Sequence, residues 1–189
     1  MIFVRHGQSA WNVVYARTRI DDPNFPDAKL TDEGRRQAAE AAGHLQGRGL
    51  RRLLASPYSR ALETAHIIAD RLGGLPIGVE PLVREHGRFQ CDVGSRRTLL
   101  SERWPALDFA HLEEEWWPAG LDESDANLAD RSRSFRARMA AEPDWSEVAV
   151  ISHWGFIRHL TGFELRNCGL VTYDPVRGHG KLLTAEPTG

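Results

Sequence analysis

A histidine stands between an arginine and a glycine directly after the first apolar run of the chain. Residues 1–4 read Met-Ile-Phe-Val, and Arg5, His6 and Gly7 follow. The guanidinium is a planar fork that suits an oxyanion, the imidazole can act as nucleophile or base near neutral pH, and the glycine lets backbone approach a ligand. In an open α/β sheet, such groups meet a ligand at the carboxyl end of a strand. The tripeptide indicates a phosphate site containing a histidine, although a chance tripeptide with a hydrogen-bonded loop histidine explains these three residues equally well.

An arginine and a second histidine stand at the ends of predicted elements. Arg60 follows the turn 56–59 and falls in the first turn of a predicted helix, where a positive charge opposes the helix dipole. An arginine in that place makes more sense if it faces an anion. His153 ends the apolar run 148–152, so it follows its strand as His6 follows the first one. A lone histidine after a strand is usually a hydrogen-bonded buried group, but packing alone does not require two of them.

A carboxyl group follows the third predicted strand, 77–80. Glu85 lies in the sequence Arg-Glu-His-Gly, from which it could reach the same edge of the sheet. A protonated carboxyl group there can act as a general acid. His86 and Asp92 are close enough in the sequence to compete for this role, and a solvated surface charge is the plain alternative for Glu85.

Short apolar runs alternate with longer segments of helical periodicity along most of the chain. This alternation predicts an α/β fold with three layers, α/β/α, around a mostly parallel central sheet. Thr31, followed by two acidic residues, is typical of a helix start, and the later glycines are typical of a helix stop. The predicted strands are 2–5, 52–55, 77–80, 148–152, 171–174 and 181–185. The predicted helices run from Thr31 to Gly47, from Ser59 to Gly73 and from Ser124 to Met139, and a short helix follows Trp154-Gly155 and runs through Arg158 to Gly162.

The stretch 88–139 interrupts this alternation because it is rich in Trp, Pro and Glu. We therefore expect a single domain over residues 1–189, with a small helical lobe or lid inserted at about 88–139. The pair Trp116-Trp117 in this lobe is a candidate for lining a substrate pocket, although packing inside the lobe is the commoner role. The insertion 11–30 is interpreted as a loop that either faces the substrate or lies on the surface. The helical spacing of Arg131 and the three arginines after it predicts a solvated face.

The composition argues against several classes of function. The 24 Lys and Arg against 26 Asp and Glu give a net charge of −2, so no overall basic field favours nucleic acid or an anionic membrane. No run approaches the ~20 apolar residues that span a bilayer, and the first residues do not resemble a leader, so we expect a soluble cytoplasmic protein. Cys91 and Cys168 lack metal-ligand spacing and are expected to be buried free thiols. His44, His66 and His159 also lack that spacing and are expected to face solvent or another helix.

Taken in chain order, these pieces resemble the histidine phosphatase superfamily, the phosphoglycerate mutase-like proteins. Any one piece is weak, but their ordered occurrence over residues 1 to about 170 is specific. The matching pieces are Arg5-His6-Gly7 with Ser9, Trp11 and Asn12, then Leu30-Thr31-Asp32-Glu33-Gly34 with Gln37, then the run from Ser56 to Ala65, then Arg84-Glu85, and finally Ser152-His153 before a helix.

The resemblance implies a role for each candidate site residue. His6 is implied to be the nucleophile that carries the phosphoryl group as a phosphohistidine, for which its imidazole must be neutral. Glu85 is implied to protonate the leaving alkoxide and then to activate water. The phosphate oxygens are implied to be held by Arg5, Arg60 and His153, with Asn12 as a neutral donor.

The activity that this resemblance implies is hydrolysis of small phosphomonoesters without a metal or other cofactor. One alternative is a phosphoglycerate mutase-type phosphotransferase, which must shield its phosphohistidine from water. Another is a noncatalytic protein that binds phosphorylated ligands on the same fold. Trp154 stands where many members of the family have glycine, which predicts a bulkier, apolar pocket floor. The sequence leaves open the physiological substrate and the oligomeric state, a homodimer included.

Overall fold

The computed structural model describes residues 1–19 and 25–184. These residues form a six-stranded sheet with the strand order β3-β2-β4-β1-β5-β6. The first four strands pair in parallel, whereas β5 and β6 run antiparallel, so the prediction of a mostly parallel sheet is confirmed. The strands are β1 (Ile2–Arg5), β2 (Arg52–Ala55), β3 (Ile77–Val79), β4 (Val148–Ser152), β5 (Leu170–Asp174) and β6 (His179–Leu182).

β1 lies between β4 and β5 inside the sheet, and its side chains are buried on both faces. Ile2 and Val4 belong to one apolar cluster, whereas Met1 and Phe3 belong to a second cluster on the opposite face. Successive side chains of a strand point to opposite faces, so an uninterrupted apolar run fits a strand that is covered on both sides. The same argument holds for β4, in which every residue is buried.

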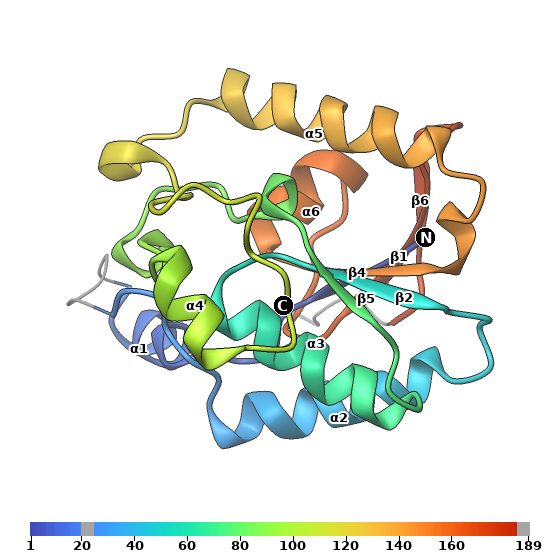
Figure 1. Ribbon diagram of the computed structural model, residues 1–189, viewed down its shortest axis with the longest axis horizontal. Coiled ribbons are helices and arrows are strands. Elements are labelled where there is room, and N and C mark those ends of the chain that lie inside the picture. The colour runs from blue at the N-terminus through green and yellow to red at the C-terminus, as the bar shows by residue number, and fades with distance from the viewer. Residues whose placement is uncertain (20–24, 185–189) are drawn as a thin grey trace.

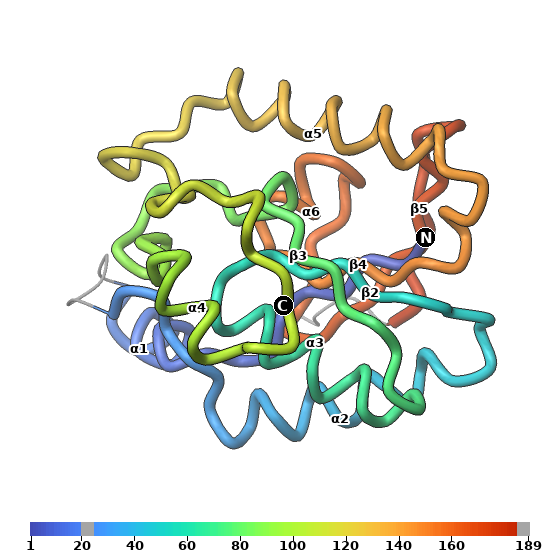
Figure 2. The backbone as a smooth tube through the Cα atoms, viewed as in Figure 1, coloured from blue at the N-terminus to red at the C-terminus, as the bar shows by residue number. Residues whose placement is uncertain are grey.

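Helices cover both faces of the sheet and complete the three layers (Figure 1). α2 (Asp32–Leu45) and α3 (Ser59–Arg71) pack side by side against one face. α5 (Asp125–Ala141) and α6 (Trp154–Thr161) cover the other, and Figure 2 shows α5 running above α6. The rings of Phe135 and Phe156, one from each helix, lie 6.0 and 6.3 Å from that of Phe3. The predicted α/β/α architecture is confirmed.

A helix, α1 (Ala10–Thr18), occupies part of the segment 11–30 that was expected to be a loop. The Ser9 hydroxyl accepts the backbone N–H of Asn12, and the Asn12 side chain accepts the backbone N–H of Ser9. This reciprocal arrangement is a capping box with asparagine in the usual place of glutamate, which is why its signal was missed. The expectation of a loop was therefore wrong for α1, and the acidic residues Asp21 and Asp22 lie outside the described residues.

The stretch 88–139 contains α4 (Arg97–Arg103) and most of α5. Trp116, only 8% exposed, joins the cluster under α2 and α3, with its ring 4.7 Å from that of Tyr58. Trp117 packs edge-on against Trp116. Neither is among the described residues that line the cavity discussed below, so the pocket-lining interpretation of this pair was wrong. Short 3-10 helices span Pro81–Val83, Gln90–Asp92, Ala119–Leu121 and Trp145–Glu147.

Several boundaries and smaller expectations can be compared directly. β3 ends at Val79, one residue before its predicted end at Glu80. The Glu80 carboxylate accepts the backbone N–H of Leu82 and so starts a turn. The last strand lies at 179–182 instead of 181–185, whose final residue is outside the described part of the chain. Both cysteines are buried free thiols, as predicted. In the described ranges, no helix is both long and apolar enough to cross a membrane.

Candidate active site

The carboxyl ends of β1 and β4 bring two histidines together. Arg5 is in register with Ser152, and each is the last residue of its strand. His6 and His153, which directly follow them, therefore leave the sheet as neighbours. The backbone N–H of His6 donates to the Ser152 carbonyl at 2.9 Å, and the two imidazole centroids are 5.1 Å apart. Two histidines that are distant in the sequence thus meet at one edge of the sheet.

The hydrogen bonding of His6 fixes which ring nitrogen is free. Its Nδ1 lies 2.7 Å from the carbonyl oxygen of Gly7. A carbonyl can only accept, so in the neutral ring Nδ1 carries the hydrogen and Nε2 keeps its lone pair. Burial, followed by the positive charges of Arg60 and Arg5, holds the pKa of His6 well below its ordinary value. The imidazole is therefore neutral at neutral pH.

His153 is completely buried beside His6 and, unlike His6, is not among the described residues that line the cavity. Its Nε2 lies 2.8 Å from the Ser56 hydroxyl, while its Nδ1 is buried without a partner among the described residues. Burial holds the pKa of His153 well below its ordinary value, and the charge of Arg60 adds to the effect. If Nε2 accepts from the Ser56 hydroxyl, Nδ1–H is left as a donor, and a buried donor without a partner is costly unless a ligand completes it.

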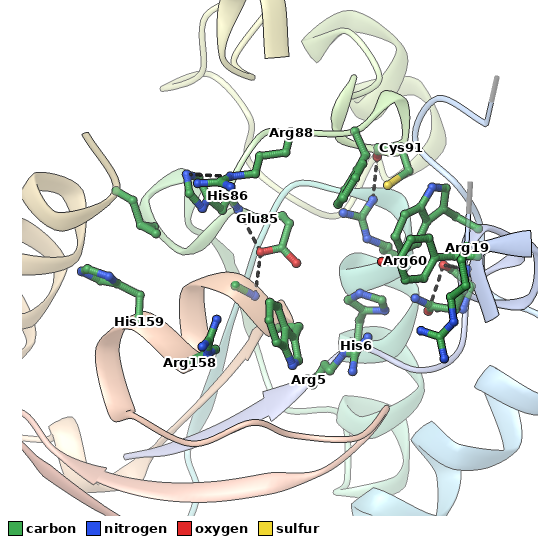
Figure 3. A pocket seen from close by; sticks show the side chains of 18 of the residues that line it. Arg5, His6, Arg19, Arg60, Glu85, His86, Arg88, Cys91, Arg158 and His159 are labelled. Atoms are coloured by element: carbon green, nitrogen blue, oxygen red, sulfur yellow. Dashed lines mark hydrogen bonds between the residues drawn. The ribbon is translucent and has the colours of Figure 1, made fainter. Parts of the chain in front are cut away.

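Two arginines, Arg5 and Arg60, line one cavity together with His6 (Figure 3). Arg5 donates from Nη1 to the Leu165 carbonyl at 2.8 Å, and its Nε is buried with no partner in the described part of the chain. Burial lowers the pKa of Arg5 to about 10, which leaves the side chain charged at neutral pH. Arg60 is 3% exposed and donates to the Cys91 carbonyl at 2.9 Å and to Asp92 at 3.0 Å. Both guanidinium groups are held in place by protein acceptors.

Asp92, one of the two alternative acids, serves to hold Arg60. Its Oδ1 accepts from Arg60, and its Oδ2 accepts the backbone N–H groups of Arg88 and Phe89 at 3.2 and 3.1 Å. The side chain is completely buried and is not among the described residues that line the cavity. The Asp92 carboxylate is thus one anion that faces Arg60, the residue for which the sequence predicted an anionic partner. Because Asp92 is buried outside the cavity lining, it is poorly placed to protonate a ligand.

Glu85 presents one carboxyl oxygen to the cavity (Figure 3). Its Oε1 accepts the backbone N–H groups of His86 at 2.8 Å and Gly155 at 2.9 Å. An oxygen that accepts twice leaves the carboxyl proton to Oε2. Burial, followed by the charge of Asp92, raises the pKa of Glu85 above its usual range. A Cβ at Gly155 would lie 2.6 Å from Oε1, so a larger residue there would displace the Glu85 carboxyl group.

A buried ion pair holds the loop that carries Glu85. Arg131 donates from Nε and Nη2 to both carboxylate oxygens of Glu123, at 2.7 and 2.8 Å. It also donates to the carbonyls of Leu82, Arg84 and Glu85, at 2.7, 2.8 and 3.0 Å. Because Arg131 is only 6% exposed, its assignment to a solvated face was wrong. The spacing of arginines on a helix does not reveal that one of them has a buried carboxylate partner outside that helix.

The remaining alternative acid and the predicted neutral donor both line the cavity. His86 Nε2 lies 2.7 Å from the carbonyl oxygen of Glu123. Glu123 also pairs with Arg131, which holds the backbone carbonyl of Glu85. Asn12 Oδ1 accepts from the Ser9 backbone and hydroxyl at 2.9 and 3.0 Å and from Asn167 at 3.3 Å. The oxygen of Asn12 is therefore committed to capping α1, and donation to phosphate from its amide nitrogen stays a prediction.

The cavity has a volume of about 1050 Å³, at the upper end for small-molecule pockets. It has room for more than a phosphate group. Trp154 lines the cavity and is 36% exposed, and the bulkier, apolar pocket floor that it led us to expect stays a prediction. In the part of the chain that the structure describes, no cluster of three or more His, Cys, Asp or Glu could hold a metal ion. The lining residues not predicted from sequence are Tyr15, Arg19, Arg88, Phe89, Cys91, Asp125, Leu128, Gly155, Arg158 and His159.

Comparison with known proteins identifies the family. The model of the histidine phosphatase superfamily, branch 1, matches residues 1–174. The chain belongs to this superfamily, so the resemblance seen in the sequence is confirmed.

The relatives include both phosphatases and mutase-like proteins. The chain is 33% identical to a probable phosphatase of Schizosaccharomyces pombe, over 82% of this chain and 74% of the relative. It is 30% identical to the probable phosphoglycerate mutase GpmB of Erwinia tasmaniensis, over 90% and 82%. It is similar to the solved mycobacterial glucosyl-3-phosphoglycerate phosphatase in complex with VO3, with a TM-score of 0.65, 25% identity and 98% coverage of both chains. The homologues support a phosphatase.

Proposed function

We propose that the protein hydrolyses small phosphomonoesters through a phosphohistidine on His6. The observation that carries this proposal is the arrangement of a neutral imidazole with a free Nε2, two fixed guanidinium groups and one free carboxyl oxygen around a single cavity. Each is a group that phosphoryl transfer needs: a nucleophile, charge for the phosphoryl oxygens and an acid for the leaving group.

In the first step the Nε2 lone pair of His6 forms a bond to phosphorus. The bond between phosphorus and the ester oxygen breaks, and its electron pair goes to that oxygen, which takes the proton from Glu85 Oε2. The free alcohol leaves. Arg5 and Arg60 face the negative charge on the phosphoryl oxygens, and Nδ1–H of His153 is proposed to donate to one of them.

In the second step water attacks phosphorus and gives its proton to the Glu85 carboxylate. The bond between phosphorus and Nε2 breaks, inorganic phosphate leaves, and both His6 and Glu85 return to their initial states. The positive charge that a metal ion would supply comes from the arginines, so we propose a metal-independent reaction.

Hydrolysis is favoured over phosphotransfer between hydroxyl groups. A mutase must keep water from its phosphohistidine, and the inserted stretch 88–139 is short. Much of that stretch is occupied with packing, since Trp116 and Phe135 are buried in the two core clusters. The curated relatives named as phosphatases support the same choice.

Phosphate release in the presence of EDTA tests the proposal. The purified protein should release inorganic phosphate from p-nitrophenyl phosphate, and from at least one member of a panel of sugar phosphates, phosphoglycerates, nucleotides and phosphopeptides. Interconversion of phosphoglycerates without phosphate release would indicate a mutase. Binding of phosphate or vanadate without turnover of any substrate would indicate a noncatalytic binding protein.

A further inference from the structure

Three aromatic rings gather on one part of the cavity lining. Trp11 and Tyr15 of α1 stack with their centroids 4.7 Å apart and an interplanar angle of 13°. Phe89 contacts both rings, at centroid distances of 5.1 and 6.2 Å. All three line the cavity and are only partly buried. We call Trp11, Tyr15 and Phe89 the aromatic wall.

The aromatic wall is separate from the hydrophobic core. Neither of the two core clusters formed by the described residues includes any of its rings. None of the nine residues of α1, all of which the structure describes, is fully buried. Large aromatic side chains that are left at a cavity and outside the core are typical of a binding surface.

The identity of Trp11 supports this interpretation. Its Nε1–H is buried and has no hydrogen-bond partner in the described part of the chain. An unpartnered buried donor lowers stability, and phenylalanine at this position would avoid that cost. The demands of folding therefore do not explain a tryptophan at this position. A larger flat face for a ligand does.

We infer that the aromatic wall binds the leaving group of the substrate, and that this group carries a planar aromatic ring. The inference rests on the proposed function and names its substrate class as phosphomonoesters of alcohols that carry an aromatic or heteroaromatic ring. With the phosphate between Arg5 and Arg60, the ring of the leaving group contacts the wall. Aromatic pairs gain stacked or edge-on interactions beyond burial, which a saturated ring of the same size does not.

A matched pair of substrates tests the inference. The leaving groups of 2-phenylethyl and 2-cyclohexylethyl phosphate are both primary alkoxides of similar size, so their demand for a general acid is nearly the same. The protein should hydrolyse the phenyl compound with a kcat/KM about three to ten times higher, as expected for one aromatic contact.

Variants locate the source of that preference. Trp11→Leu and Phe89→Leu should each remove most of it, while inhibition by vanadate, which needs only the phosphate end of the site, stays unchanged. Trp104→Leu is the matched control, since Trp104 is a partly buried tryptophan that contacts His66 and is not among the described residues that line the cavity. Equal kcat/KM values for the two substrates, or a preference that survives both wall variants, would overturn the inference.

A failure of the proposed function would be recognised separately. In that case neither substrate is hydrolysed, and binding of the two corresponding phosphonates is measured by calorimetry. Tighter binding of the phenyl phosphonate, lost in Trp11→Leu and kept in Trp104→Leu, supports the aromatic wall. Equal binding of the two phosphonates overturns it.

Discussion

Two neighbouring histidines are kept uncharged by the groups around them. Burial away from solvent, followed by the charges of Arg60 and Arg5, lowers the pKa of both His6 and His153 and so disfavours a proton on either ring. The backbone carbonyl of Gly7 then selects the tautomer of His6. The same arginines that would bind phosphate thus keep the nucleophile in its reactive form.

The guanidinium fork of Arg60 is the first residue-scale test. Arg60→Lys keeps the charge but loses the paired donors that now reach Cys91 and Asp92. We expect kcat/KM to fall by ~10² or more, and inhibition by vanadate or phosphate to weaken in parallel. Steady-state kinetics with vanadate titration measure both. Unchanged inhibition would remove Arg60 from the phosphate site.

The role of Glu85 is tested by the leaving group. An acid matters for an alkoxide and little for p-nitrophenolate, so Glu85→Gln should lower kcat/KM for alkyl phosphates by ~10² or more, and far less for p-nitrophenyl phosphate. Asp92→Asn should lower both together, because Asp92 acts through Arg60. Glu85 is not the acid if Glu85→Gln lowers kcat/KM equally for both substrates and His86→Gln lowers it selectively for alkyl phosphates.

The pH dependence of kcat/KM follows from the same groups. Glu85 donates only below its raised pKa, so kcat/KM for an alkyl phosphate should fall as the pH rises through that value. His6 attacks only above its lowered pKa, so activity should persist into mildly acidic solution. Glutamine does not titrate, and pH profiles of Glu85→Gln should lack the alkaline fall. A variant that keeps this fall would show that another group, or the substrate phosphate, causes it.

At the scale of elements, α5 supports the loop that carries Glu85. Arg131→Lys keeps the charge but cannot replace the donors to three carbonyls and Glu123. We expect kcat/KM for alkyl phosphates to fall about tenfold or more, with a smaller loss for p-nitrophenyl phosphate, because the acid is displaced. Arg138→Met is the control, since Arg138 lies on the same helix as Arg131 and pairs with Glu80 instead of Glu123. Equal losses for both substrates would reduce Arg131 to a purely structural role.

The close contact between α2 and the loop after His6 gives a stability test. A Cβ at Gly34 would lie 2.1 Å from the Gln8 carbonyl oxygen, whereas a Cβ at Gly43, on the exposed side of the same helix, would contact nothing within 4 Å. Gly34→Ala should lower the free energy of unfolding by about 1–3 kcal/mol. Gly43→Ala should raise it by up to ~1 kcal/mol. Urea unfolding measures both, and similar effects of the two substitutions would contradict the proposed close approach.

At the scale of the whole molecule, the sequence predicted the layers and the bounds of three strands correctly. The runs 2–5, 52–55 and 148–152 are strands at those bounds, because unbroken apolar stretches fit only a sheet covered on both faces. Parallel pairing then brings their carboxyl ends together, so His6 and His153 meet. These features depend on local patterns that a single sequence displays.

The parts that the sequence did not predict depend on contacts between distant segments. Arg131 finds Glu123 and three loop carbonyls only after folding, and Phe89 reaches Trp11 and Tyr15 from another segment. Once α1 is recognised, the spacing of Trp11 and Tyr15 by four residues could have placed both on one helix face.

The central claim, a phosphohistidine on His6, is tested most directly by trapping it. Protein mixed with a 32P-labelled substrate and quenched in alkali should carry acid-labile, alkali-stable label, and His6→Ala should carry none and lose more than 99% of kcat, at least ~3 kcal/mol of transition-state stabilisation. His66→Ala, not among the described residues that line the cavity, should keep both label and activity. A His6→Ala protein that stays folded and retains more than about a hundredth of wild-type kcat would contradict the mechanism.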